Sequence, residues 1–136
     1  MRFESENDLI RENKAIETFV DIFNGFYKKL DQNDIDFAVY DTNFNLICYV
    51  EIKGRNKNII DSYPLPISAK KFIKLFDKKI NPVIIWACLD GIIYAKIKDL
   101  KGYIKWGGRT PRYNSFNDLE FMIYFYKQDC MKYIKY

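Results

Sequence analysis

Three charged residues, Asp36, Glu51 and Lys53, have the types and spacing that metal-assisted chemistry requires. Glu51 and Lys53 stand two residues apart at the end of the largely apolar segment 46–53. Because alternate side chains of a β-strand project from the same face, an extended segment would present both head groups on one side. A hairpin with the preceding segment would bring Asp36, near the start of that segment, beside Glu51.

Two neighbouring carboxylates repel each other unless a cation neutralises them. Mg²⁺ and Mn²⁺ take oxygen ligands and commonly use only one or two carboxylates, with water and phosphate completing the shell. We therefore expect Asp36 and Glu51 to bind Mg²⁺ (or Mn²⁺), and Lys53 to present positive charge to a phosphate. A surface ion pair at the end of a strand is the alternative interpretation, because the acid-x-Lys tripeptide recurs three more times in the chain.

The amino-acid composition excludes the catalytic mechanisms that depend on histidine. The 136 residues include no histidine, which is the usual general base at neutral pH and the commonest metal ligand. Histidine-dependent triads and zinc sites are therefore excluded. The three cysteines are far apart and form no CxxC pair, which predicts free thiols in a reducing compartment. Because no segment is apolar enough for a membrane span or a signal peptide, we expect a cytoplasmic protein with no membrane partner. The net charge of +4 is only a weak indication of an anionic partner.

The elements that must position these residues indicate one α/β (α+β) domain over 1–136. Apolar periodicity predicts a helix over 7–24, ended by Gly25 in a left-handed conformation, and a second helix from its N-cap Ser68 to about Lys79. We interpret 54–67, rich in Asn and Pro, as a loop. Alternating and apolar segments predict strands over 26–30, 35–41, 45–53, 83–89, 92–97, 103–106 and 120–126. This order indicates a central mixed sheet flanked by helices, with extra C-terminal strands.

Asp36 followed by Glu51-Ile52-Lys53, in this order of elements, resembles the PD-(D/E)XK nuclease superfamily. Its members have the restriction-endonuclease-like fold with an αβββαβ core. The resemblance covers roughly residues 7–97, and a second helix that begins with a serine and carries a lysine is similar to a phage or small resolvase-like branch. By resemblance, Asp36 and Glu51 bind Mg²⁺, the Ile52 carbonyl is a further ligand, and Lys53 helps to activate water.

Many members of the superfamily also use a glutamate from the first helix. Glu12 lies within the apolar stripe of that helix, where a carboxylate is costly unless it is paired or bound to metal. We therefore expect Glu12 to complete the metal site, with Glu17 in reserve. Pairing of Glu12 with a lysine is nearly as good an interpretation.

Basic side chains near these elements are candidates for nucleic-acid binding through backbone phosphates. They are Arg55, Lys57, Lys70, Lys71, Lys74, Arg109 and Arg112. Tyr63, in the polar loop, is the aromatic residue that we single out for contact with a base.

The resemblance implies a metal-dependent nuclease that hydrolyses phosphodiester bonds, in DNA first and RNA second, as an endonuclease or as a junction resolvase or repair enzyme. Because such enzymes are often dimers, it also admits a homodimer. The alternative is a noncatalytic nucleic-acid-binding or structural module on the same fold.

Overall fold

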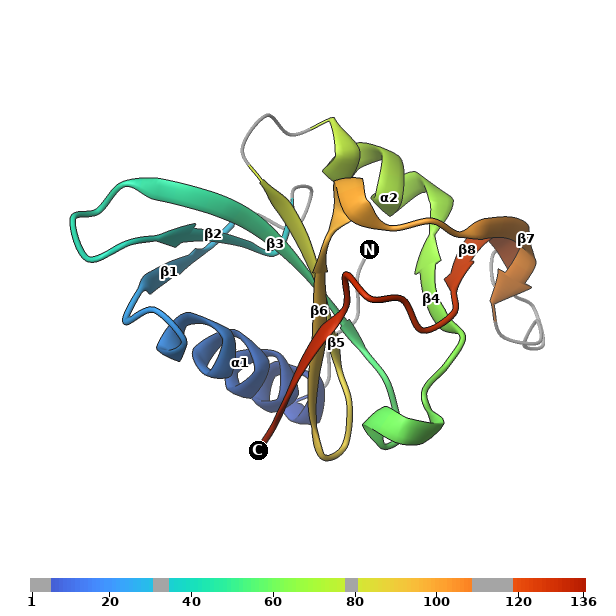
Figure 1. Ribbon diagram of the computed structural model, residues 1–136, viewed down its shortest axis with the longest axis horizontal. Helices are drawn as coiled ribbons and strands as arrows, with labels where there is room; N and C mark the ends of the chain where they lie inside the picture. Colours follow the sequence, from blue (N-terminus) through green and yellow to red (C-terminus); the bar gives the residue numbers. More distant parts are fainter. Residues whose placement is uncertain (1–5, 31–34, 78–80, 109–118) are drawn as a thin grey trace.

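The computed structural model describes residues 6–30, 35–77, 81–108 and 119–136. In chain order the elements are α1 (Glu6–Asp21), β1 (Phe26–Lys29), β2 (Phe37–Tyr40), β3 (Leu46–Gly54), the 3-10 turn η1 (Ile59–Asp61), β4 (Leu65–Ser68), α2 (Ala69–Phe76), β5 (Pro82–Ala87), β6 (Gly91–Lys96), the 3-10 turn η2 (Ile97–Asp99), β7 (Tyr103–Gly108), β8 (Leu119–Phe125) and β9 (Lys132–Lys135). The expected restriction-endonuclease-like core with extra C-terminal strands is confirmed (Figure 1). Among these residues, no helix is both long and apolar enough to cross a membrane.

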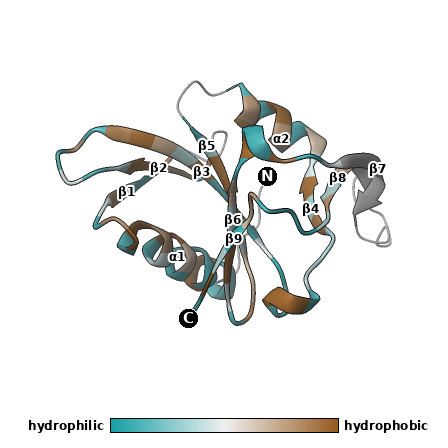
Figure 2. Cartoon of the chain, viewed as in Figure 1, coloured by the Kyte–Doolittle hydropathy of each residue, from teal (hydrophilic) through white to brown (hydrophobic). Residues whose placement is uncertain are grey.

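Helix α1 forms because residues that recur every three or four positions bury one of its faces. The buried residues are Glu12, Ala15, Ile16, Phe19 and Val20, and hydrophobic and hydrophilic residues alternate along its ribbon in Figure 2. The helix ends at Asp21, before the predicted boundary. Asn24 takes the left-handed conformation with φ of 55°, and the Gly25 N–H donates to the Val20 carbonyl at 3.0 Å. The left-handed residue is thus Asn24 rather than Gly25, because an Asn tolerates this conformation better than most residues.

The large sheet has the strand order β1-β2-β3-β5-β6-β9. Strands β3 and β5 are parallel and the other neighbours are antiparallel, which gives the expected mixed sheet. Alternation along β3 separates two cores: Val50 and Ile52 pack with α1, whereas Tyr49 packs against a second cluster that contains Trp86 and Leu75 of α2. Helix α1 therefore covers one face of the sheet, and α2 lies over the other.

A second sheet, of strand order β4-β8-β7, supports α2. Strand β4 falls mostly within the segment 54–67, which we expected to be a loop because it is rich in Asn and Pro. Its edge position tolerates the proline, and the Pro66 carbonyl accepts a hydrogen bond from Trp86 Nε1 at 2.8 Å. Strand β9 was also unexpected. It is short, has lysines at both ends, and forms the far edge of the large sheet.

Helix α2 begins where the sequence indicates. The Ser68 hydroxyl accepts a hydrogen bond from the Lys71 backbone N–H at 3.2 Å, which is the predicted N-cap. The described helix ends at Phe76, short of the predicted Lys79. Leu75 is its fully buried residue, so the helix is anchored to the core by its last turn while its first turn faces β3.

Candidate active site

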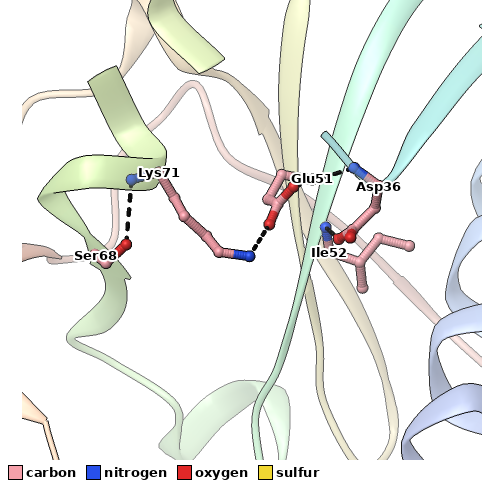
Figure 3. Close-up of polar contacts among 5 residues, drawn as sticks. All are labelled: Asp36, Glu51, Ile52, Ser68 and Lys71. Carbon is pink, nitrogen blue, oxygen red and sulfur yellow. Dashed lines mark hydrogen bonds and ion pairs between the residues drawn. The ribbon is translucent and has the colours of Figure 1, made fainter. Parts of the chain in front are cut away.

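Asp36 and Glu51 lie side by side in the interior, immediately before β2 and near the end of β3. Only 3% of Asp36 and 5% of Glu51 is exposed. The Asp36 backbone N–H donates to Glu51 Oε2 at 3.2 Å, and the Ile52 N–H donates to Asp36 Oδ2 at 2.8 Å. Figure 3 shows these two bonds crossing between the neighbouring segments. The backbone N–H of Asp36 therefore orients the Glu51 carboxylate, and the backbone N–H of Ile52 orients the Asp36 carboxylate.

The β2–β3 hairpin creates this placement. Phe37 pairs with Val50 in the antiparallel register, so the residue before Phe37 faces the residue after Val50. The hairpin loop is fixed by Asp41, whose Oδ1 accepts the backbone N–H groups of Asn43 and Asn45, each at 2.9 Å. Such side-chain caps of a turn are what Asp supplies in loops. The register shifts by one residue between Val39 and Tyr40, so the turn and this irregularity together place Asp36 opposite Glu51.

Lys71 reaches the same carboxylate from the opposite side. Its Nζ lies 2.7 Å from Glu51 Oε1, and the side chain comes from the first turn of α2. Figure 3 shows Glu51 extending from β3 toward this lysine. The sequence marked Lys71 for phosphate contact, and its pairing with Glu51 was not anticipated. The Ser68 N-cap, which the sequence predicts, places Lys71 in the first turn of α2. That this turn lies beside β3 depends on β4, which the sequence did not predict.

The surroundings raise the pKa of the Glu51 carboxyl above its ordinary value. Burial is the largest cause, and the neighbouring Asp36 charge adds to it. The Lys71 ammonium and the Asp36 backbone N–H oppose this shift, because they stabilise the ionised form. The two carboxyl groups therefore lie close together in the interior, where water solvates their negative charge poorly.

Lys53 and Ile52 follow Glu51 on β3. Lys53 stands opposite Trp86 in an uninterrupted parallel ladder, so it lies on the same face as Glu51 by strand alternation. Glu51 is buried and Lys53 is exposed, which puts the lysine at the boundary with solvent. Ile52 contributes its N–H to Asp36, and its side chain packs into the core on the α1 side.

Glu12 and Glu17 take different positions. Glu12 is 6% exposed, as its place in the apolar stripe predicted, and its Oε2 lies 3.9 Å from Lys29 Nζ. Glu17 is exposed and accepts a hydrogen bond from the Tyr27 hydroxyl at 3.2 Å. In the described part of the chain, no three Cys, Asp or Glu side chains gather closely enough to hold a metal ion. The structure therefore does not bring Glu12 into one ligand group with the two strand carboxylates.

The donor set at Asp36 and Glu51 fits a hard divalent cation. Glu51 lies on β3 and Asp36 directly precedes β2, and each carboxylate is oriented by a backbone N–H. Two protein carboxylates are enough for Mg²⁺ when water and substrate phosphate supply the remaining ligands. The Lys71 ammonium already lies against Glu51, so the position accommodates positive charge. Asp36 and Glu51 are the residues that would hold Mg²⁺ or Mn²⁺.

Apart from Lys71, which pairs with Glu51, the predicted nucleic-acid contacts fall into three groups. Lys57, Lys70 and Lys74 occupy exposed positions. Arg55 instead donates from Nε and Nη2 to the Ser62 carbonyl at 3.0 and 2.9 Å, which holds the loop after β3. Arg109 and Arg112 lie outside the described residues. Tyr63 is partly buried and packs against the core cluster, so its ring is not a freely exposed stacking surface.

We compared the chain with known protein families, curated proteins and solved structures. The model of a family described as "phage putative PDDEXK endonuclease" matches residues 1–132. Searches of curated proteins and of solved structures gave no significant match. The family match spans Asp36, Glu51, Lys71 and the second sheet. The chain therefore belongs to the phage putative PDDEXK endonuclease family.

Proposed function

We propose that the protein is a nuclease that uses Mg²⁺ or Mn²⁺ to hydrolyse phosphodiester bonds, with DNA as its substrate and RNA as the alternative. The observation that carries this proposal is the buried pair Asp36–Glu51, in which the Asp36 N–H donates to the Glu51 carboxylate and the Ile52 N–H donates to the Asp36 carboxylate. The description of the family to which the chain belongs, a putative endonuclease family, supports the same proposal. Burying two carboxylates together lowers stability even with Lys71 beside Glu51, which supports a functional role for the pair as a cation site.

The roles of the side chains follow from their positions. Asp36 and Glu51 would hold the ion, while the Ile52 N–H keeps the Asp36 carboxylate oriented. A bound divalent ion supplies polarisation of the phosphate and makes a nucleophilic water more acidic. Lys53, on the same face as Glu51 and exposed, would stabilise negative charge that develops on the phosphate. None of these roles requires an imidazole.

Substrate binding would rely on backbone phosphates, because the exposed lysines can neutralise them without reading sequence. Lys57 follows the metal strand, and Lys70 and Lys74 lie on α2, the helix that reaches the site through Lys71. Binding through these lysines should weaken steeply as salt rises. Arg55 is less suited to this role, since its guanidinium donates to the Ser62 and Pro64 carbonyls of the loop.

A cleavage assay tests the proposal. Linear, nicked and branched DNA, with a matched RNA, are incubated with the protein in Mg²⁺, in Mn²⁺ and in EDTA. We expect metal-dependent cleavage that falls about 100-fold or more in Glu51→Gln and in Lys53→Met. The exposed residues Glu6 and Lys98 supply matched controls, because Glu6→Gln and Lys98→Met make the same chemical changes outside the site. Activity that survives both Glu51→Gln and Lys53→Met would refute the assignment.

One observation favours a second candidate function, a noncatalytic nucleic-acid-binding module. Lys71 already pairs with Glu51 at 2.7 Å, so this carboxylate has a counter-ion without any metal. A module of this kind would bind DNA with a strong salt dependence and show no metal-dependent cleavage. Calorimetry that detects no Mn²⁺ binding at millimolar concentration, together with tight DNA binding, would favour it over the nuclease.

A further inference from the structure

The ion pair between Lys71 and Glu51 occupies an oxygen of the proposed metal site. Lys71 Nζ lies 2.7 Å from Glu51 Oε1, while Oε2 of the same carboxylate accepts the Asp36 backbone N–H at 3.2 Å. Both oxygens of Glu51 thus have a partner within the protein. A divalent ion that took Oε1 as a ligand would place its charge next to the Lys71 ammonium, and two cations so close repel one another.

The position of Lys71 is set by the fold around it. Ser68, the last residue of β4, caps α2 and accepts the Lys71 backbone N–H. Strand β4 is in turn tied to the large sheet by the hydrogen bond from Trp86 Nε1 to the Pro66 carbonyl. The loop that leads into β4 is held by Arg55. These contacts of Ser68, Trp86 and Arg55 together hold the first turn of α2 beside β3. The fold therefore determines where Lys71 lies relative to Glu51.

The two partners differ in how freely they can move. The Glu51 side chain is 6% exposed and the Lys71 side chain is 47% exposed. Glu51 is fixed on a central strand, whereas the lysine head can swing into water without being buried elsewhere. Of the two partners, the lysine is therefore the one that has room to move away from the pair.

We propose that Lys71 is a displaceable counter-ion, which neutralises Glu51 in the metal-free protein and competes with the divalent ion for this carboxylate. The inference rests on the proposed function, because it assumes that Glu51 is a metal ligand. It assigns Lys71 a role distinct from the phosphate contact expected from the sequence and from the role proposed for Lys53. Metal affinity is then set by the difference between the ion–carboxylate interaction and the lysine–carboxylate interaction.

Calorimetric titration with Mn²⁺ in the absence of nucleic acid tests this competition. At pH 8, where protons compete least, we expect Lys71→Met and Lys71→Gln to bind Mn²⁺ about fivefold to tenfold more tightly than the unmodified protein, which is the scale of one half-exposed ion pair. Lys71→Arg keeps a cation in place and should bind no more tightly than the unmodified protein. Lys98→Met, which removes a lysine charge from an exposed position on η2, should leave the affinity unchanged.

The outcomes separate this inference from the proposed function. If the unmodified protein binds Mn²⁺ but neither neutral Lys71 variant binds more tightly, Lys71 does not compete with the metal and the inference is wrong. If neither the unmodified protein nor any variant binds Mn²⁺, the proposed nuclease function fails, and the inference fails with it. Far-ultraviolet circular dichroism of each variant confirms that folded protein is titrated, and the Gln variant serves if the Met variant does not fold.

Discussion

The coupling between Lys71 and Glu51 can be measured without any metal or substrate. A double-mutant cycle combines Lys71→Met with Glu51→Gln and compares the free energy of unfolding of the four proteins. If the ion pair forms as described, the effect of the double substitution is smaller than the sum of the two single effects. Lys71→Met should be the more destabilising single change, because it leaves the buried Glu51 charge beside Asp36 without its ammonium partner.

The structure sets the size of the expected coupling. The two charged atoms are 2.7 Å apart, and the side chains are 47% and 6% exposed. Breaking a fully buried pair costs roughly 3–5 kcal/mol, and an exposed pair contributes less than about 1 kcal/mol. Because only the carboxylate is buried, we expect a coupling between these limits, about 1.5 kcal/mol.

Urea unfolding at pH 7 in EDTA provides the four free energies. A second cycle, which pairs Lys70→Met with Glu51→Gln, is the matched control, because Lys70 is the adjacent exposed lysine of α2. Its coupling should be below about 0.3 kcal/mol, within the usual limit of additivity. If the Lys71 cycle gave no more coupling than the Lys70 cycle, the ion pair would not exist in solution and the competition argument would lose its basis.

Three further predictions concern the scaffold. Gly91→Ala should lower the free energy of unfolding by about 1–3 kcal/mol and lower the melting temperature, because the new methyl group would press on the Ile134 backbone of β9. The pKa of Asp41 is lowered, chiefly by the hydrogen bond from the Asn45 backbone N–H. Its support of the hairpin is therefore present above the ordinary Asp pKa and lost as pH falls through the lowered value, which amide shifts will report. Burial raises the pKa of Cys48 to about 12, so a thiol reagent at pH 8 should modify it only after unfolding.

Controls for these predictions come from the same chain. Gly54→Ala should be far milder than Gly91→Ala, because its methyl group would meet only the flexible Arg11 side chain. Asp41→Asn should abolish the pH dependence of the Asn45 amide. Cys130 is partly exposed and should react before Cys48. Fast modification of Cys48 in the native protein, or equal effects of the two glycine substitutions, would contradict the packing described for β3 and β9.

Much of the fold follows from local patterns. The apolar stripe of α1, the Asp41 turn and the Ser68 cap are each made by residues within a few positions of one another, so the sequence predicts them well. Strands β4 and β9 were missed because their signals are weak: one contains Pro66 and the other is a short edge strand with lysines. Both depend on distant partners, β8 and β6, which local patterns cannot indicate.

In the candidate site, too, contacts set by local sequence could be predicted, whereas contacts between distant segments could not. The approach of Asp36 to Glu51 could be inferred because a single hairpin joins them, although the register shift between Val39 and Tyr40 was not anticipated. Lys71 and Arg55 could not be assigned, since their contacts depend on how the loop and β4 return to the sheet. The burial of Glu12 was predicted from periodicity, but its distance from the other carboxylates depends on how α1 packs on the sheet.

The central claim is that Asp36 and Glu51 together hold a divalent metal ion. A crystal of the protein soaked in Mn²⁺ tests it most directly, because the anomalous scattering of manganese marks the ion without reference to activity. The account predicts one strong anomalous peak between the two carboxylates, with Lys71 Nζ withdrawn from Glu51 Oε1. A map without a peak at these residues, with the Lys71–Glu51 ion pair intact at saturating Mn²⁺, would contradict it.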